Sequence, residues 1–175
     1  MKTKRAALIT GVAIAASTMV MTTGASSASA VSYTSFRNES SGKCLEIENS
    51  SRSNGAKAQQ WDCNGQAGSR WYTRDAGGGY RYIVNQNSGK CLEIENSSGR
   101  NGAKAQQWDC NGQAGAKWKI SYAKMFGATL ITSSSGKSLE IENSSRSNGA
   151  KAQQWDGFVN NTIRSNTLWA EILGF

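Results

Sequence analysis

The chain of 175 residues contains no histidine. Without an imidazole there is no Ser-His-Asp or Cys-His nucleophile and no histidine-ligated metal site. A glycine-rich phosphate-binding loop is also missing, and after residue 30 no apolar run approaches the length of a membrane span. We therefore expect no metal ion, no cofactor and no membrane-spanning segment in the folded protein.

The first 30 residues differ in composition from the rest. Three basic residues stand within the first five positions, a mostly small, apolar run follows from Ala6 to Val20, and Ala28-Ser29-Ala30 is a small-x-small cleavage site. This pattern is typical of a secretory signal peptide, with cleavage predicted after residue 30. The remaining 31–175 would be a secreted single domain with 17 basic and 12 acidic residues, a formal net charge of +5.

An internal repeat dominates this domain. The segment Ser41–Asp62 returns at Ser88–Asp109 and at Ser135–Asp156 almost unchanged, and successive copies are 47 residues apart. The third copy is followed by about four extra residues within Phe158–Asn166. A threefold object without a linker or a separate catalytic domain is therefore expected. The three repeats run approximately over 31–77, 78–124 and 125–175.

Each repeat is expected to contain four short strands. In Leu45-Glu46-Ile47-Glu48, apolar and charged residues alternate, as in a strand with one buried face. Asn54-Gly55 tolerates positive φ and marks the turn into the following strand. The strands expected in the first repeat are Tyr33–Asn38, Lys43–Glu48, Lys57–Asp62 and Arg70–Asp75. The strands that flank the second and third copies are expected at Tyr80–Asn85, Lys117–Tyr122, Ala128–Thr132 and Leu168–Leu173.

Four strands in each of three repeats give twelve strands. A repeat this small cannot bury its own apolar face, so the three repeats must close on one another. Three copies are too few for a stable propeller, and a solenoid would need distinct terminal caps. The sequence therefore predicts an all-β fold of three pseudo-symmetric repeats, a closed barrel with hairpin caps, which is the β-trefoil.

Four cysteines in an exported protein predict disulfides, and three pairings are possible. The repeat distinguishes among them. Cys44 and Cys63 have the equivalents Cys91 and Cys110 in the second repeat, whereas the third repeat has lost both members together. Joint loss is what a bond within one repeat predicts. We therefore expect Cys44–Cys63 and Cys91–Cys110.

The string Gly42-Lys43-Cys44-Leu45-Glu46-Ile47, followed by Asn54-Gly55 and by Gln59-Gln60-Trp61-Asp62-Cys63, resembles the ricin-type β-trefoil lectins, above all the secreted bacterial carbohydrate-binding modules. The resemblance extends over the whole predicted domain, three times. It implies a β-trefoil with up to three shallow sugar pockets, one in each repeat.

The resemblance also implies which residues would bind sugar. The family carboxylate falls on Glu46, Glu93 and Glu140, and the aromatic platform on Trp61, Trp108 and Trp155. The glutamine two residues before the platform is Gln59, Gln106 and Gln153. The polar residue after the second cysteine is Asn64 and Asn111, with Phe158 at that place in the third repeat.

Two departures from the family pattern stand out. The family carboxylate is usually Asp, and here it is Glu in every repeat. The Gln of the closing Gln-x-Trp is replaced, and of the Asn beside it only Asn166 remains. The tryptophans of that motif, which are expected to pack in the core, are Trp71, Trp118 and Trp169.

Strand alternation supports the same site independently. Gln59 and Trp61 share one face of their strand, and Glu46 lies opposite the apolar Leu45 and Ile47, so all three are expected to face outward. A carboxylate for hydroxyl groups and a flat indole for C–H groups suit a sugar. Gln60 and its equivalents fall on the inward face, where polar side chains do not fit the pattern; bonding to backbone at a barrel end would accommodate them, and the sequence leaves this open.

These observations favour a secreted, non-enzymatic carbohydrate-binding protein that is a monomer. Glu46 and Glu48 point the same way along one strand, with no opposing wall for glycosidase chemistry. No nucleic-acid reading element is recognisable. The alternative is an interaction or protease-inhibitor module on the same fold, with degenerate sugar pockets and a functional loop at Phe158–Asn166.

Overall fold

The structure is a computed structural model that describes residues 32–159 and 162–173. The predicted signal peptide lies outside the described residues. Within them, no helix has the length and the apolar character needed to cross a membrane.

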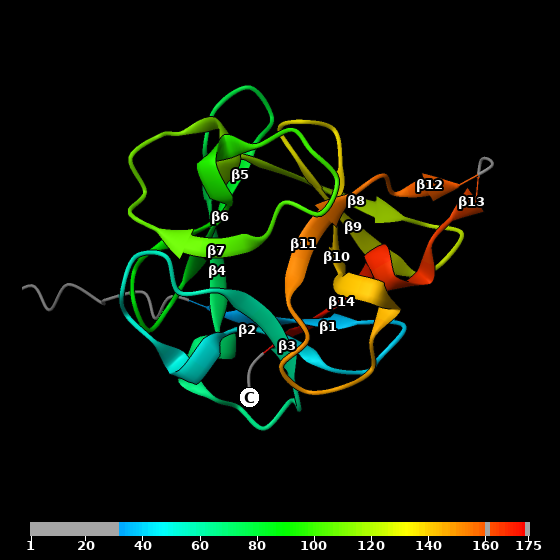
Figure 1. Ribbon diagram of the computed structural model, residues 1–175, viewed down its shortest axis with the longest axis horizontal. Helices are drawn as coiled ribbons and strands as arrows, with labels where there is room; N and C mark the ends of the chain where they lie inside the picture. Colours follow the sequence, from blue (N-terminus) through cyan, green and yellow to red (C-terminus); the bar gives the residue numbers. More distant parts are fainter. Residues whose placement is uncertain (1–31, 160–161, 174–175) are drawn as a thin grey trace, which may run out of the picture. The chain divides into compact units, whose positions relative to one another are not determined.

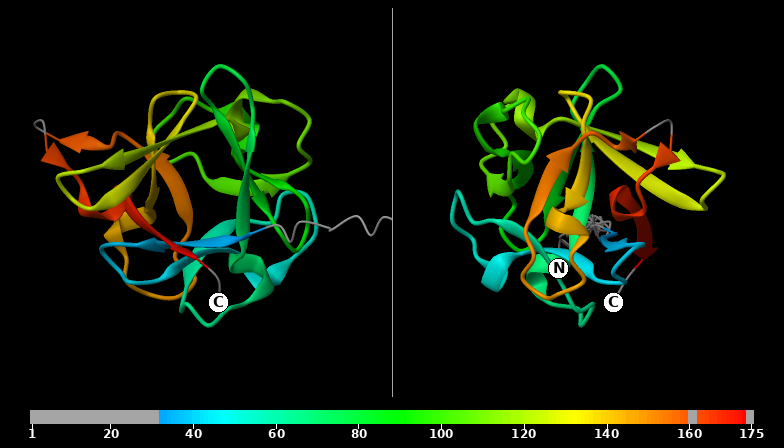
Figure 2. Two further views of the ribbon diagram at one scale, coloured as in Figure 1. Left: turned by 180° about the vertical axis from the view of Figure 1, so that it is seen from behind. Right: turned by 45° about the vertical axis from the view of Figure 1, so that its right-hand side comes forward.

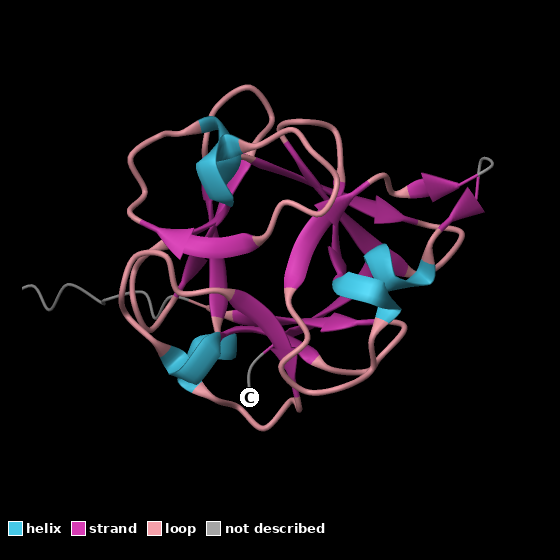
Figure 3. Ribbon diagram, viewed as in Figure 1, coloured by secondary structure: helices cyan, strands magenta, loops and turns pink. Residues whose placement is uncertain are grey.

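All twelve predicted strands are present, with ends within two residues of the predicted bounds, and strands joined by loops make up most of the fold (Figure 3). The first repeat contains β1 (Thr34–Asn38), β2 (Cys44–Ile47), β3 (Ala58–Trp61) and β4 (Trp71–Asp75). The second contains β5 (Arg81–Asn85), β6 (Cys91–Ile94), β7 (Ala105–Trp108) and β8 (Trp118–Ala123). The third contains β9 (Ala128–Ser133), β10 (Ser138–Ile141), β11 (Ala152–Trp155) and β14 (Leu168–Leu173).

The insertion in the third repeat adds a small hairpin that was not predicted. Its strands are β12 (Phe158–Val159) and β13 (Thr162–Ile163), and it forms a two-stranded sheet of its own. The described residues also contain six single-turn 3₁₀ helices. They are η1 (Glu48–Ser50), η2 (Ala67–Ser69), η3 (Glu95–Ser97), η4 (Ala114–Ala116), η5 (Glu142–Ser144) and η6 (Ser165–Thr167).

Six strands close into a barrel, and three hairpins cap it. Antiparallel pairing runs β1–β4–β5–β8–β9–β14 and returns from β14 to β1. The caps are the pairs β2–β3, β6–β7 and β10–β11, whose second strands surround a common centre in Figure 1. This is the predicted β-trefoil, in which the three repeats share one core.

The barrel core is built from the residues that the repeat pattern marked as apolar. Trp71, Trp118 and Trp169 are fully buried, which confirms their predicted place. Each indole N–H donates to a backbone carbonyl of the neighbouring hairpin, at 3.0 Å for Trp71 and Leu45 O. A buried indole thus keeps its polar atom satisfied while its rings fill the core. Leucine and isoleucine of β2, β6 and β10 pack in the same cluster.

Both predicted disulfides form, Cys44–Cys63 and Cys91–Cys110, each with a Cα–Cα distance of 5.1 Å. Each joins the start of a hairpin strand to the residue two beyond the end of its partner strand. In the third repeat the same places hold Ser138 and Gly157. The reasoning from joint loss of both cysteines is therefore confirmed.

Candidate functional site

The repeated hairpin brings its glutamate and its glutamine face to face. Glu46 of β2 pairs with Gln59 of β3 in the antiparallel register, and Gln59 Nε2 donates to Glu46 Oε1 at 2.8 Å. Gln106 and Glu93 repeat this bond at 2.9 Å, as do Gln153 and Glu140. One carboxylate oxygen in each repeat is therefore fixed by the neighbouring strand.

The three glutamates lie on the predicted side of their strands, but the expectation that they are exposed to solvent was wrong. They do lie opposite Leu45 and Ile47 and their equivalents, but Glu46 and Glu140 are only 2% exposed. Alternation predicts the side of a strand, and it does not predict whether another segment covers that side, as the second 3₁₀ helix of each repeat does here. Nor does Glu46 pair with Lys43 or Lys57, because these lysines bond to Asp62 and Glu95.

In the second repeat the predicted residues surround one pocket of about 240 Å³. Glu93, Gln106, Trp108 and Asn111 all line it, and Trp108 is 37% exposed. This combines a buried acceptor with an accessible aromatic face. The third repeat has a pocket of about 140 Å³ lined by three of its predicted residues, Glu140, Gln153 and Trp155.

The first repeat differs from the other two at its carboxylate. Glu46 Oε2 is buried and has no hydrogen-bond partner among residues 32–159 and 162–173. Burial raises the pKa of Glu46, although the Gln59 bond and the charge of Lys151 act in the opposite direction. Trp61 is half-buried, and Asn64 is exposed in the turn after β3.

Residues that the sequence analysis did not assign also line these pockets. Asn96 and Asn143 follow the glutamate strand in their repeats and adopt left-handed φ of 55°. Asparagine tolerates this conformation better than most residues. Gln113 lines the second pocket and donates to Glu93 Oε2. These residues lie in the strings Glu-Asn-Ser-Ser and Asn-Gly-Gln, which recur in the repeats. That recurrence was the sequence signal that could have identified them as pocket residues.

Each site also depends on the repeat before it. Lys57 of the first repeat donates to Gln106 Oε1 at 2.8 Å and to Glu95 Oε2 at 2.9 Å in the second. Because the Gln106 oxygen accepts from this lysine, its amide nitrogen is directed toward Glu93. The same contacts run from Lys104 to the third repeat and from Lys151 to the first. The bond from Lys151 lowers the pKa of Glu48.

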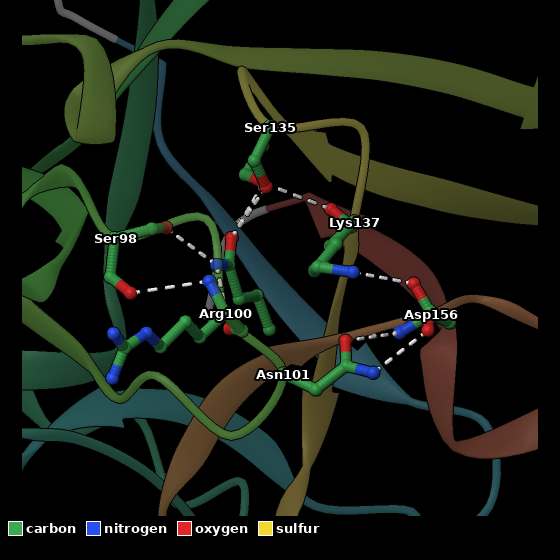
Figure 4. Close-up of polar contacts among 8 residues, drawn as sticks. Ser98, Arg100, Asn101, Ser135, Lys137 and Asp156 are labelled. Carbon is green, nitrogen blue, oxygen red and sulfur yellow. Dashed lines mark hydrogen bonds and ion pairs between the residues drawn. The ribbon is translucent and has the colours of Figure 1, made fainter.

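The Asn-Gly turn of each repeat packs beside the platform tryptophan of the next. A Cβ placed on Gly102 would lie 3.5 Å from the ring of Trp155, so the backbone passes close to the indole edge. The adjacent Asn101 donates to Asp156 Oδ2 at 2.7 Å, and Asp156 also accepts from Lys137 at 2.6 Å (Figure 4). This turn therefore fixes the strand end that carries the indole.

The inward-facing glutamines also join neighbouring repeats. Gln60 Nε2 donates to the carbonyls of Ser145 and Ser147, at 2.8 and 2.9 Å, and Gln60 Oε1 accepts from Ser41. The structure thus settles their place: these glutamines bond to backbone carbonyls of another repeat. Gln107 and Gln154 bond in the same way to the preceding repeat.

Comparison with known proteins identifies this arrangement. The family model described as "Ricin-type beta-trefoil lectin domain-like" matches residues 20–108 and 75–155. The chain belongs to the ricin-type β-trefoil lectin-like family. A comparison with curated protein sequences gave no match.

Solved structures share the fold of this ricin-type domain. ThreeFoil, a designed threefold symmetric protein, is 32% identical, with 80% of this chain and 97% of that protein covered and a TM-score of 0.74. An exo-β-1,3-galactanase from Clostridium thermocellum is 31% identical (TM-score 0.76), and the match covers 83% of this chain but only 31% of the galactanase. The C-half of an earthworm R-type lectin in complex with GalNAc is 19% identical, with 82% and 99% covered and a TM-score of 0.63.

Proposed function

We propose that this ricin-type domain is a secreted, non-enzymatic carbohydrate-binding protein that uses up to three equivalent shallow sites. The observation that carries the proposal is the gathering of Glu93, Gln106, Trp108 and Asn111 around one pocket. Three of the equivalent residues gather around another in the third repeat. The proposal is also supported by the family match and by the lectins among proteins of this fold.

The chemistry of the pocket suits a sugar. The exposed indole of Trp108 offers a flat apolar face to sugar C–H groups. The ring of amide and carboxylate groups offers acceptors and donors to hydroxyl groups. Such a shallow site makes few contacts, so single-site affinity is expected at about 0.1–1 mM, or about −4 to −5.5 kcal/mol. Several sites on one rigid domain would bind a polymeric glycan more tightly through avidity.

Secretion is part of this proposal. The predicted signal peptide and the two disulfides are both compatible with an extracellular protein. Cleavage after residue 30 is tested by sequencing the amino terminus of the protein collected from the medium of a producing bacterium. Retention of the first 30 residues there would contradict this part of the proposal.

The test of binding uses glycan arrays and pull-down on insoluble polysaccharides. The variant that combines Trp61→Ala, Trp108→Ala and Trp155→Ala should lose binding. Because the Asn-Gly turns pack beside these indoles, its stability should also fall, and circular dichroism at the assay temperature checks that it is folded. Tyr122→Ala is the matched control, because Tyr122 is 66% exposed on β8 but lies outside the three sites. A wild type that holds no glycan, or a triple variant that binds as well as wild type, would contradict the proposal.

An observation also favours the alternative reading, an interaction module. The turn between β8 and β9 and the inserted hairpin lie side by side (Figures 1 and 2) and form a pocket of about 460 Å³. Its lining includes Met125, Phe126 and Phe158, which are 89%, 46% and 56% exposed. If the wild type binds no glycan but inhibits a protease, and Met125→Ser combined with Phe158→Ser abolishes that inhibition, this alternative is correct.

A further inference from the structure

One position distinguishes the third site from the other two. Gln66, Gln113 and Arg164 each stand directly before a 3₁₀ helix, at η2, η4 and η6. Each is also five residues before the core tryptophan of its repeat. The three residues are therefore equivalent, and the third repeat carries a guanidinium where the others carry a neutral amide.

Apart from this position, the second and third pockets are lined largely by equivalent side chains. Glu93, Asn96, Gln106 and Trp108 in the second pocket correspond to Glu140, Asn143, Gln153 and Trp155 in the third. The second pocket adds Ser97, Asn111 and Gln113, which are neutral. The third adds Arg164 instead. The lysine from the preceding repeat is present behind both, so the two pockets differ by one positive charge.

Arg164 is not needed to satisfy Glu140. Glu140 Oε1 accepts from Gln153 Nε2, and Oε2 accepts from Asn166 Nδ2, both at 2.9 Å. Arg164 Nη1 lies 3.8 Å from Glu140 Oε2, which makes an ion pair but is too long for a hydrogen bond. Within the described part of the chain, the guanidinium therefore keeps its N–H donors available, and its side chain is 31% exposed beside the pocket.

We propose that the third pocket binds a sugar residue bearing a carboxylate, with Arg164 as its partner, and that the second pocket binds the neutral counterpart. This inference rests on the proposed carbohydrate-binding function. A guanidinium presents paired N–H donors that match both oxygens of a carboxylate. Glu140 forms only a long ion pair with Arg164, and amide donors hold both of its oxygens, so the guanidinium can turn its N–H donors to a ligand.

The expected preference is about tenfold in affinity for the acidic sugar at the third site, as is reasonable for a charge-assisted pair at a partly exposed position. Because the pair is partly exposed, added salt should reduce the preference. The second site has Glu93 as the only charged side chain among its lining residues, so it should bind the acidic sugar less well than the neutral one.

The experiment follows each site separately by the indole N–H resonances of Trp108 and Trp155 in NMR titrations. Galactose and galacturonate are the probes, because they differ only in the group at C6. Arg164→Gln introduces the residue that the other repeats hold at this position, so its fold should persist. The buried Trp71, Trp118 and Trp169 serve as internal references.

In the wild type, Trp155 should respond to galacturonate at about tenfold lower concentration than to galactose. Arg164→Gln should remove this difference. The inference would be overturned if Trp155 responded to both probes at the same concentration, or if its preference for galacturonate survived Arg164→Gln. In that case, galactose binding at Trp108 would still support the proposed function. If neither probe shifts any indole resonance and no glycan is bound on the arrays, the proposed function and this inference both fail.

Discussion

Replacement of Gln60 by methionine tests whether side chains between repeats hold the trefoil closed. Gln60 is fully buried in the first repeat, and its amide donates to the carbonyls of Ser145 and Ser147 in the third. Its oxygen accepts from Ser41 Oγ at 2.6 Å. Methionine has nearly the same volume, so Gln60→Met removes these three hydrogen bonds without leaving a large cavity.

The expected loss follows from the number of bonds. A hydrogen bond contributes about 0.5–1.5 kcal/mol net, so three bonds correspond to about 1.5–4.5 kcal/mol. Ser147 is exposed, and water can replace part of what its carbonyl loses. We therefore expect a decrease of about 2 kcal/mol in the free energy of unfolding. For a domain of this length that corresponds to a decrease of about 4–8 °C in Tm.

The assay is urea unfolding followed by circular dichroism. An unchanged slope of the unfolding free energy against urea concentration (the m value) would indicate that only the stability has changed. Gln86→Met is the matched control, because Gln86 is exposed and should tolerate the change within about 0.5 kcal/mol. Gln107→Met should cost as much as Gln60→Met, since its contacts are equivalent, and Gln154→Met should cost more, because Gln154 Oε1 accepts from two serine hydroxyls instead of one. A stability of Gln60→Met within about 0.5 kcal/mol of wild type would refute the reasoning.

Two further predictions concern buried charge and the disulfides. Because burial raises the pKa of Glu46 above its unfolded value, the stability that its protonated form contributes is present at low pH and lost as pH rises through the raised pKa. Glu46→Gln should therefore raise the urea midpoint at about pH 7 but not at about pH 4, and an equal rise at both would contradict this. Cys91→Ser combined with Cys110→Ser, with Cys44–Cys63 intact, should lower the free energy of unfolding in urea by about 3 kcal/mol, because the bond restricts the unfolded chain. A loss under about 1 kcal/mol would contradict this explanation.

The β-trefoil could be predicted from the sequence alone because the same local pattern occurs three times along the chain. Leu45 and Ile47 alternate with charged residues, and the repeated Asn-Gly marks the turn, so strands and register follow from local rules. The joint absence of two cysteines from the third repeat was enough to pair the others. The residues assigned from the family pattern come together around the second and third pockets, and their role in sugar binding stays a prediction.

Tertiary closure decided the environment of those residues. The sequence shows that Lys57 recurs, but only the folded barrel brings it to Gln106 of the next repeat and buries Glu46 beneath its neighbours. The insertion after Trp155 likewise concealed that Arg164 takes the place of Gln113, since the two align only when counted back from the core tryptophan. Such contacts join positions about 40 to 100 residues apart, and strand periodicity carries information only about neighbours along the chain. Burial, charge pairing and the differences among the three sites were therefore set by how the repeats pack together.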